Sequence, residues 1–359
     1  MDAPSPITPP GPPRAHARGA VANPKNRFER LDIELEPEEA ADAVHRRTEF
    51  LRDDTQTIIT YNDSPDVSFG ASVNPYRGCE HGCAYCFARP THEYAGMSAG
   101  LDFESKILVK ERAPELLRAE LSRRSWKPQS LAMSGVTDCY QPIERQLQLT
   151  RRCVEVLAEF RNPVTFITKN HLITRDIDLF QELAKYRAVA AAISITSLDP
   201  ELAKHLEPRA SSPSRRLAAV EELSAAGIPT TVMFAPSIPG LNDHEMPAVF
   251  QAAAKAGAID AHYVALRLPW AVAPLFEQWL ERHAPGQKEK VLGRVREMRG
   301  GKLYNAKWGE RMSGTGIFAE QMRRLYEVSR RKAGFPPERR AALSIDSFRV
   351  PTNQLTFGF

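Results

Sequence analysis

The sequence has no long apolar run and no cysteine pattern typical of a disulfide-stabilised secreted protein. Its 359 residues include five cysteines, and an odd number in a long chain argues against a disulfide framework. No segment approaches the roughly 20 consecutive apolar residues that a membrane-spanning helix needs. Residues 1–20 lack the apolar centre of a secretory signal. These absences predict a cytoplasmic protein with no membrane partner.

The chain also lacks a strong charge of either sign. Its formal net charge is +4, and such mild basicity permits a nucleic-acid partner without requiring one. Hydrophobic residues make up 42% and charged residues 26% of the chain, which favours an ordinary globular protein over a disordered one. The length is sufficient for one large domain or two ordinary ones.

Composition divides the chain into four parts. These are a disordered tail (1–27), an N-terminal extension (28–66), a core (67–270) and a mainly helical C-terminal extension (271–359). The tail is rich in Pro, Ala and Arg and has few large apolar side chains to offset its ordering entropy. The N-terminal extension is expected to contain a short helix within 34–54 and a strand over 57–61. Helices are expected in the C-terminal extension over 275–283, 287–298 and 318–333.

Strand and helix patterns alternate six times across the core. Strands are expected over 68–73, 131–134, 164–168, 189–196, 230–235 and 262–266. Helices are expected over 114–124, 146–160, 176–186, 213–226 and 243–256. The nearly continuous apolar run of 189–196 is typical of a buried parallel strand. The alternation predicts an α/β fold with a parallel sheet, either barrel-like or doubly wound, whose chemistry lies in the loops that follow the strands.

Three cysteines lie within eight residues, as Cys79, Cys83 and Cys86 in a C-x3-C-x2-C pattern. This spacing also fits one face of a helix, but four residues that disfavour helices surround it: Pro75, Gly78, Gly82 and Pro90. A loop would let three thiolates converge on a 4Fe–4S cluster with one iron left open. Zinc is the alternative, with His81 or His92 as a fourth ligand.

The segment NPYRGCEHGCAYCFAR, with aromatic Tyr85 before the third cysteine, resembles the radical S-adenosylmethionine (SAM) superfamily. Within it, the chain resembles the spore photoproduct lyase-related branch over roughly residues 57–335. Further segments carry the resemblance: SGVTDCYQPIER at 134–145, LEPRASSP at 206–213 and APSIPGLND at 235–243.

The resemblance implies a partial (β/α)6 TIM-type barrel with a helical C-terminal extension. It implies that Cys79, Cys83 and Cys86 hold a 4Fe–4S cluster, and that SAM chelates the fourth iron. It further implies a radical SAM enzyme in which an electron, supplied by a flavodoxin- or ferredoxin-type reductant, cleaves SAM to a 5′-deoxyadenosyl radical. That radical would abstract hydrogen from the substrate.

Polar residues after the strands are candidates to hold SAM. The cofactor-binding candidates are Tyr85, Ser134, Thr137, Asp138, Lys169, Ser194, Arg209 and Ile238. Asp138 lies where superfamily members usually have a Gly-Gly-Glu-like turn, and its carboxylate would accept from the SAM ammonium. Arg209 would pair with the methionine carboxylate. Each has a structural alternative: a helix cap or turn for Asp138, a solvated side chain for Lys169 and a surface ion pair for Arg209.

The same loop contains two catalytic candidates, Cys139 and Tyr140. A thiol near the radical could return a hydrogen atom to a product radical, as a cysteine does in spore photoproduct lyases. A buried, unreactive cysteine is the alternative. The backbone near Ala265 and Leu266, and the side chain of Ile238, are expected to meet the adenine.

A basic and aromatic segment in the C-terminal third indicates a substrate class. It contains Arg294, Arg296, Arg299, Lys302, Lys307 and Arg311 beside Tyr304 and Trp308, and more basic residues follow at 323–332. Such a mixture can contact phosphates and stack on bases. We therefore expect a nucleic-acid base as substrate, in a DNA repair-like lyase reaction. The alternatives are a radical SAM enzyme acting on a peptide or small molecule, and a non-catalytic zinc or Fe–S binding module.

Overall fold

The computed structural model describes residues 6–7, 18–29, 47–337 and 342–351. Its main feature is a seven-stranded sheet in the order β11-β10-β9-β8-β7-β4-β3. The strands are β3 (Ile59–Tyr61), β4 (Ala71–Val73), β7 (Leu131–Met133), β8 (Val164–Thr168), β9 (Val189–Ser194), β10 (Thr230–Ser237) and β11 (Asp260–Ala265). All neighbours pair in parallel except β3, which is antiparallel to β4 at one edge.

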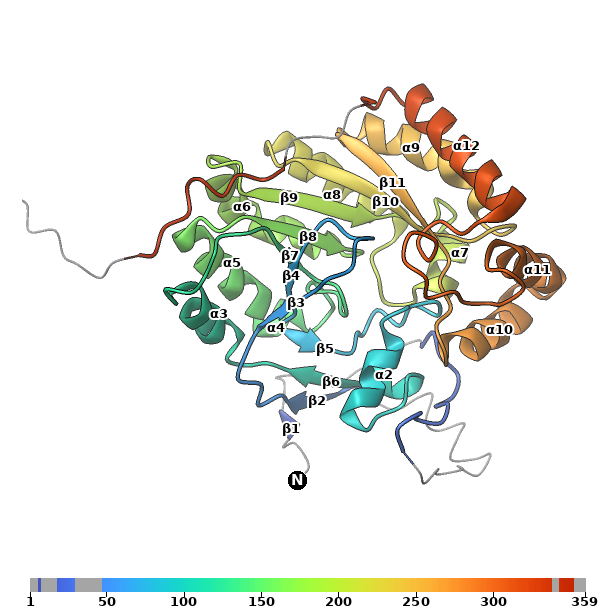
Figure 1. Cartoon of the computed structure of the whole chain (residues 1–359), viewed down its shortest axis with the longest axis horizontal. Coiled ribbons are helices and arrows are strands. Elements are labelled where there is room, and N and C mark those ends of the chain that lie inside the picture. Colours follow the sequence, from blue (N-terminus) through green and yellow to red (C-terminus); the bar gives the residue numbers. More distant parts are fainter. Residues whose placement is uncertain (1–5, 8–17, 30–46, 338–341, 352–359) are drawn as a thin grey trace, which may run out of the picture.

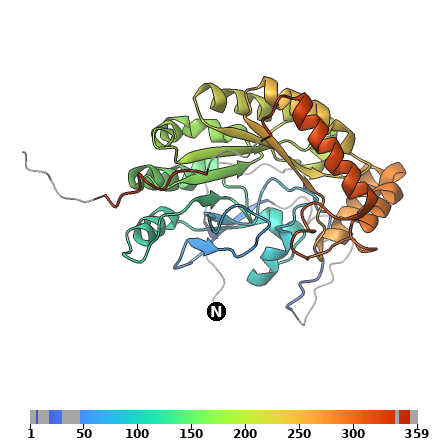
Figure 2. The same ribbon diagram turned by 45° about the horizontal axis from the view of Figure 1, so that its top comes forward.

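The connecting helices lie along one side of this curved sheet (Figures 1 and 2). They are α3 (Ala113–Leu121), α5 (Leu149–Phe160), α6 (Ile177–Ala184), α8 (Pro213–Ala225) and α9 (Met246–Lys255). Six parallel strands alternating with helices confirm the predicted α/β fold and its partial (β/α)6 barrel. All six core strands lie within or beside the ranges that the sequence predicts. Parallel strands are buried on both faces, and such strands are marked by apolar runs in the sequence.

Local signals explain where individual helices begin and end. Ser212 caps α8 by accepting from the Arg215 amide, and Pro213 occupies the first turn, where its missing N–H costs nothing. Gly227 follows the helix with φ +80°, a conformation that glycine adopts readily after a helix C-terminus. Shorter helical segments are η1 (Arg89–Ala95), α2 (Leu101–Ser105), α4 (Glu144–Leu147), η2 (His171–Asp176), α7 (Pro200–Leu206) and η3 (Asp243–Glu245).

The core lies between the sheet and these helices. Phe166 of β8 and Phe180 of α6 are fully buried, with ring centroids 4.8 Å apart. Ile193 of β9 and Val232 of β10 are equally buried beside them. Each such side chain stabilises the fold by about 1.5–3 kcal/mol relative to an exposed position, so this layer holds the strand ends in fixed positions.

A second, four-stranded sheet was not predicted. Its order is β1 (Pro6–Ile7), β2 (Glu49–Arg52), β6 (Lys106–Val109) and β5 (Tyr76–Arg77). The short helix expected within 34–54 is replaced, in the described residues 47–54, by β2; residues 34–46 lie outside the described part. Strand β2 is stabilised by parallel pairing with β6, which is more than 50 residues away in sequence and therefore invisible to local patterns.

The C-terminal extension is mainly helical, as predicted. It contains α10 (Val272–His283), η4 (Pro285–Gln287), α11 (Lys288–Met298) and α12 (Gly316–Lys332). Helix α12 packs against α9 and α11 at the β11 end of the sheet (Figure 1). Within the described residues, no helix has both the length and the apolar composition that crossing a bilayer requires.

Candidate functional site

The three clustered cysteines lie in a loop at the carboxyl end of the parallel sheet, between β5 and η1. Gly78 and Gly82 have φ angles of +78° and +66°, which other residues adopt at a cost. Backbone bonds join Cys86 N to Cys83 O (3.3 Å) and Arg89 N to Cys86 O (3.2 Å). These successive turns confirm a loop rather than a regular helix.

The thiols of Cys79, Cys83 and Cys86 are free, and the first two are buried. Burial raises the pKa of Cys83 well above its usual value, and burial followed by the neighbouring Cys79 raises that of Cys86. Among the described residues, no group of three or more His, Cys, Asp or Glu side chains is arranged to hold one metal ion. A 4Fe–4S cluster makes a different demand, because each thiolate binds its own iron, and three neighbouring free thiols fit that demand.

A fully buried ion pair supports the loop from one side. Arg89 donates to the Cys83 carbonyl through Nε (2.9 Å) and Nη2 (2.8 Å). Its Nη1 donates to the carbonyls of Ala99 and Gly100. The same guanidinium pairs with Glu104, and both side chains are 0% exposed. Arg89 therefore fixes the backbone beside the second cysteine.

The N-terminal segment, defined here as residues 18–29, packs on the cysteine loop. Glu104 accepts from the amides of Gly19 (2.9 Å) and Ala20 (2.7 Å). A Cβ atom on Gly19 would lie 1.7 Å from the Gly82 carbonyl oxygen, so only glycine fits there. Residues 18–27 were predicted to belong to a disordered tail, and these contacts place them against the loop instead. Of the rest of that predicted tail, the structure describes Pro6–Ile7 alone.

The loop after β7 holds the cysteine loop from another side. Ser134 Oγ donates to the Thr137 carbonyl (2.5 Å), and Thr137 Oγ1 donates to the Gly78 carbonyl (2.5 Å). Gln141 Oε1 accepts from the Glu80 amide at 2.9 Å. The hydroxyls of Ser134 and Thr137, predicted to hold SAM, are thus engaged within the protein and position the loop.

Asp138 has its acceptor capacity filled by the protein. Its Oδ1 accepts from the Tyr140 amide (2.9 Å) and Thr168 Oγ1 (2.7 Å), and its Oδ2 accepts from the Lys169 amide (2.8 Å). His81 Nδ1 lies 3.3 Å from Oδ2. Burial opposes charge on Asp138, but the charge and hydrogen bond of His81, together with the hydrogen bonds from Lys169 and Thr168, outweigh burial and lower the pKa of the carboxyl. These four partners leave no free lone pair for an ammonium group, so Asp138 positions the strand ends.

Cys139 and Tyr140 lie in the apolar core. Both are 0% exposed and pack in the main hydrophobic cluster. The Cys139 thiol faces the Met133 carbonyl at 3.8 Å, and the Tyr140 hydroxyl donates to Asp176 (3.0 Å). The geometry gives no support to the predicted catalytic roles of these two residues, which contribute to packing behind the strand ends.

A second buried polar cluster surrounds Tyr85 of the cysteine loop. The Tyr85 hydroxyl donates to Glu207, which also accepts from Thr196 Oγ1 (2.5 Å) and pairs with Arg216. Burial would raise the pKa of Glu207, but Arg216 and then Lys169 outweigh it and lower that pKa. Glu207 is therefore a buried anion beside the Cys83 thiol.

Lys169 faces this cluster with an ammonium group that has unused donors. Its Nζ lies 5.9 Å from the centre of the Tyr85 ring, and its charge lowers the pKa values of Cys83, Cys86 and Glu207. Within the part of the chain that the structure describes, Nζ forms no hydrogen bond or ion pair. Lys169 is thus available to an anionic group bound at the cysteine loop.

The end of β10 contributes a polar and an apolar group. The Ser237 hydroxyl is buried and has no partner among the described residues, a deficit that a bound ligand would correct. Ile238 is 0% exposed and packs in one cluster with Cys83, Tyr85 and Leu266. The sequence predicted Ile238 at the site but missed Ser237, because a single serine at a strand end has no distinctive pattern.

Arg209 and the backbone amides near Ala265, predicted to contact SAM, already form hydrogen bonds within the protein. Arg209 pairs with Glu80 (2.6 Å) and donates to Thr48, so it joins three segments of the protein. The amides of Ala265 and Leu266 donate to the carbonyls of Met312 and Ser237. Ser194 is buried, and its carbonyl accepts from the Arg216 guanidinium at 3.1 Å. Arg209 is therefore a positioning residue here, whereas the Ser194 hydroxyl forms no hydrogen bond within the described part of the chain.

Much of the predicted basic segment is also engaged in holding the fold. Arg299 donates to the carbonyls of Leu266 and Glu310. Arg311 pairs with Asp66, and Lys307 pairs with Glu310. Arg294 pairs with Asp243 at 3.5 Å. These residues do not form an open cationic surface.

A smaller basic and aromatic pair lies directly beside the cysteine loop. Phe87 follows Cys86 and is 48% exposed. The Arg267 guanidinium carbon, two residues beyond β11, lies 4.8 Å from the centre of the Phe87 ring. Arg267 Nε is buried without a hydrogen-bond partner in the described residues. The sequence missed this pair because its members are 180 residues apart.

Comparisons with known proteins agree with this geometry. Residues 73–253 match the family model described as the radical SAM superfamily. An uncharacterized protein of Mycobacterium tuberculosis is 36% identical over 234 residues, which cover 65% of this chain and 68% of that protein. An uncharacterized protein of Methanocaldococcus jannaschii is 31% identical over 173 residues, covering 48% of this chain and 62% of its own.

One similar solved structure is a spore photoproduct lyase variant with bound AdoMet and dinucleoside spore photoproduct. It superposes with a TM-score of 0.59 at 17% identity, over 85% of each chain. At that identity, the likeness shows a shared fold.

Proposed function

Because this chain belongs to the radical SAM superfamily, whose members use a 4Fe–4S cluster and SAM, we propose that Cys79, Cys83 and Cys86 hold its cluster. We further propose that the substrate is a nucleic-acid base. The observation that carries the cluster assignment is the loop itself: three free thiols at the carboxyl end of the sheet, supported by buried groups on both sides.

When bound, the cluster supplies an electron that cleaves SAM to methionine and a 5′-deoxyadenosyl radical, which takes hydrogen from the substrate. Lys169 would donate to the carboxylate of SAM, since its ammonium lies beside Cys83 and Cys86 and has unused donors. The Ser237 hydroxyl would bind a polar group of the nucleoside, and Ile238 would pack on the adenine. A flavodoxin- or ferredoxin-type protein is the expected reductant.

Burial around the loop protects this chemistry from water. The N-terminal segment packs on Gly82, and Tyr85 is buried against Glu207. Exclusion of water strengthens electrostatic contacts inside a site and prevents side reactions of reactive intermediates. The arrangement therefore supports a reaction that generates a radical.

The Phe87–Arg267 pair supports a nucleic-acid base as substrate. An exposed ring can stack on a base, at about 1–3 kcal/mol for each stacked base, and a guanidinium beside it can contact a phosphate. Phe87 adjoins Cys86, so a base stacked there would lie next to the cluster. The spore photoproduct lyase structure described above contains a bound dinucleoside spore photoproduct in a similar fold.

The cluster assignment is tested by reconstituting the full chain with iron and sulfide, reducing it and adding SAM. We expect 5′-deoxyadenosine release, and loss of both this release and the visible cluster absorption in Cys79→Ala. Cys153→Ala is the control, because Cys153 is a buried thiol on α5 in the apolar core. Release that survives in Cys79→Ala, Cys83→Ala and Cys86→Ala would overturn the assignment.

The substrate class is tested by measuring oligonucleotide binding at increasing salt. Phosphate contacts make affinity fall steeply with salt, and we expect such a fall, reduced in Arg267→Gln. Phe87→Ala should weaken binding at all salt concentrations. Binding that is absent or insensitive to salt would contradict the nucleic-acid proposal and favour a peptide or small-molecule substrate.

A further inference from the structure

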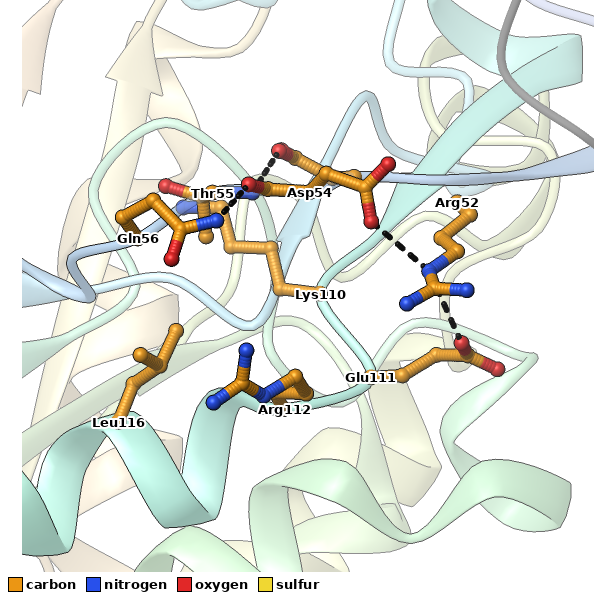
Figure 3. Close-up of a pocket in the computed structure, with 9 residues that line it drawn as sticks. Arg52, Asp54, Thr55, Gln56, Lys110, Glu111, Arg112 and Leu116 are labelled. Atoms are coloured by element: carbon orange, nitrogen blue, oxygen red, sulfur yellow. Dashed lines mark hydrogen bonds and ion pairs between the residues drawn. The ribbon is translucent and has the colours of Figure 1, made fainter.

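A small hollow lies between the second sheet and α3. It has a cavity volume of about 30 Å³ and is lined by the end of β2, the 53–56 loop, the end of β6 and the start of α3. Figure 3 shows these side chains around the hollow. One of its lining residues is joined to the chain that leads into the cysteine loop. The Lys110 amide donates to the carbonyl of Pro75 (3.0 Å), which directly precedes β5.

The acidic residues of the hollow are already paired with arginines. Arg52 Nε lies 2.9 Å from Asp54 and 3.7 Å from Glu111, and Figure 3 shows it between the two. Arg77 pairs with Asp53 at 2.8 Å. Each of these three carboxylates is therefore paired with an arginine of the protein.

Two cations of the hollow have no such partners. Lys110 is 7% exposed, and among the described residues its ammonium forms no hydrogen bond or ion pair. Arg112 lies beside it in Figure 3 and likewise has no ion pair or side-chain hydrogen bond in the described part of the chain. Burial, followed by Arg77, lowers the pKa of Lys110 to about 8, and the Asp53 carboxylate only partly opposes that shift.

The start of α3 adds a third source of positive potential. Arg112 is the residue before the helix, and no side chain caps its first turn. The aligned peptide dipoles of a helix place about half a positive charge at its amino end. The first amide of α3, that of Ala113, already donates to the Lys110 carbonyl and Pro114 has none, so this end would favour a phosphate mainly through its dipole. Helix α3 is nine residues long, long enough for this effect.

We propose that this hollow binds a phosphate group, held by Lys110, Arg112 and the amino end of α3. The proposal rests on these contacts and not on the proposed function, because none of the three elements contacts SAM in that proposal. The ligand has a single chemistry with two sources: free phosphate, or a phosphodiester of a nucleic acid that extends from the cysteine loop. The small volume suits one phosphoryl group rather than a whole nucleotide.

The test follows the chemical reactivity of Lys110 in the full chain. Reductive methylation with formaldehyde, read by mass spectrometry, is compared with and without inorganic phosphate at constant ionic strength. A bound anion should hold the amine protonated and shielded, so phosphate should slow methylation of Lys110 but not of exposed Lys127. Oligonucleotides with phosphodiester or uncharged methylphosphonate linkages then distinguish the two sources.

A matched pair of variants tests the assignment of the contacts. Arg112→Gln and Arg123→Gln remove the same charge from the two ends of α3, and both residues are exposed. Arg112→Gln should weaken phosphate protection by about tenfold, the size of one charge-assisted contact, and Arg123→Gln should leave it unchanged. Protection by phosphate or by the phosphodiester oligonucleotide alone supports the site. No protection, equal protection by chloride, or equal protection in Arg112→Gln would overturn it.

Discussion

Two fully buried ion pairs flank the cysteine loop, and they differ in what surrounds them. Arg89 and Glu104 are both 0% exposed, and their remaining polar atoms bond to backbone groups of the loop and the N-terminal segment. Arg216 and Glu207 are 1% and 0% exposed. Next to this second pair, however, the Lys169 ammonium and the Ser237 hydroxyl have no hydrogen-bond partner among the described residues.

The difference separates a supporting region from a binding region. Buried polar groups in native proteins are nearly always hydrogen-bonded, so an unpaired group that persists beside a buried charge indicates a missing ligand. The Arg89–Glu104 pair has every polar atom bonded and holds the loop in place. The unpaired buried atoms nearest to it in sequence, His92 Nδ1 and Glu93 Oε1, belong to side chains that are bonded through their other polar atom. On the Glu207 side, the buried Ser237 hydroxyl and the half-buried Lys169 ammonium form no hydrogen bond at all within the described residues, and this is where we propose that SAM binds. Each prediction below tests this contrast, from the largest expected effect to the smallest.

Replacing either buried arginine should cause the largest loss of stability among these variants. Arg89→Met and Arg216→Met should each lower the free energy of unfolding by about 3–5 kcal/mol, because each leaves a buried carboxylate unpaired. The loss should be smaller for Arg216→Met, since Lys169 still lies near Glu207. Urea unfolding measures both. Arg118→Met breaks an exposed pair with Glu159 and should cost about 1 kcal/mol or less. If Arg118→Met lost as much stability as the two buried variants, burial of the pairs beside the loop would not explain their effect.

Replacing Lys169 should affect the ligand and leave the fold intact. Lys169→Met should weaken SAM binding by about 10- to 100-fold, the equivalent of a hydrogen bond to a charged group, with stability within about 0.5 kcal/mol of the parent. Calorimetric titration of SAM into the reconstituted, oxidised protein measures this without turnover. Lys185→Met removes a lysine paired with Glu182 on the surface and should bind SAM normally. Unchanged affinity in Lys169→Met would place the binding region elsewhere.

Enlarging Gly19 should disturb the supporting side. In Gly19→Ala the added Cβ would overlap the Gly82 carbonyl, and such overpacking costs about 1–3 kcal/mol. We expect lower stability in urea and faster loss of cluster absorption in air. Gly293→Ala is the control, since no atom lies within 4 Å of its added Cβ in α11; helix propensity predicts a gain of up to about 1 kcal/mol. If Gly19→Ala kept the stability and the cluster lifetime of the parent, the N-terminal segment would not support the loop.

Removing the Ser237 hydroxyl should have the smallest effect. Ser237→Ala should weaken SAM binding by about two- to tenfold, the net value of one neutral hydrogen bond. Its folding should be unchanged or slightly improved, because an unpaired buried hydroxyl is costly. Ser224→Ala removes another buried hydroxyl without a partner, on α8, and should leave SAM affinity unchanged. The same calorimetric titration compares them, and equal affinities would show that Ser237 does not contact the ligand.

Sequence patterns predicted the site where the chemistry depends on neighbouring residues. Cys79, Cys83 and Cys86 were proposed from their spacing, Lys169 from its place after a strand, and Ile238 from the resemblance of 235–243 to the superfamily. The patterns failed where a group's partner is distant. Arg209 was expected to be free for a carboxylate, yet it pairs with Glu80, 129 residues away. Glu104, unremarkable in sequence, accepts from Gly19, 85 residues before it.

The sequence by itself determined the strand and helix alternation and the cysteine motif, because apolar periodicity and spacing act over a few residues. It therefore determined the α/β barrel and the superfamily. Only the tertiary structure decided which polar groups remain available. Asp138 and Arg209 are fully paired, whereas Lys169, Ser237 and Lys110 are not, since hydrogen-bond satisfaction depends on segments that folding brings together from distant parts of the chain.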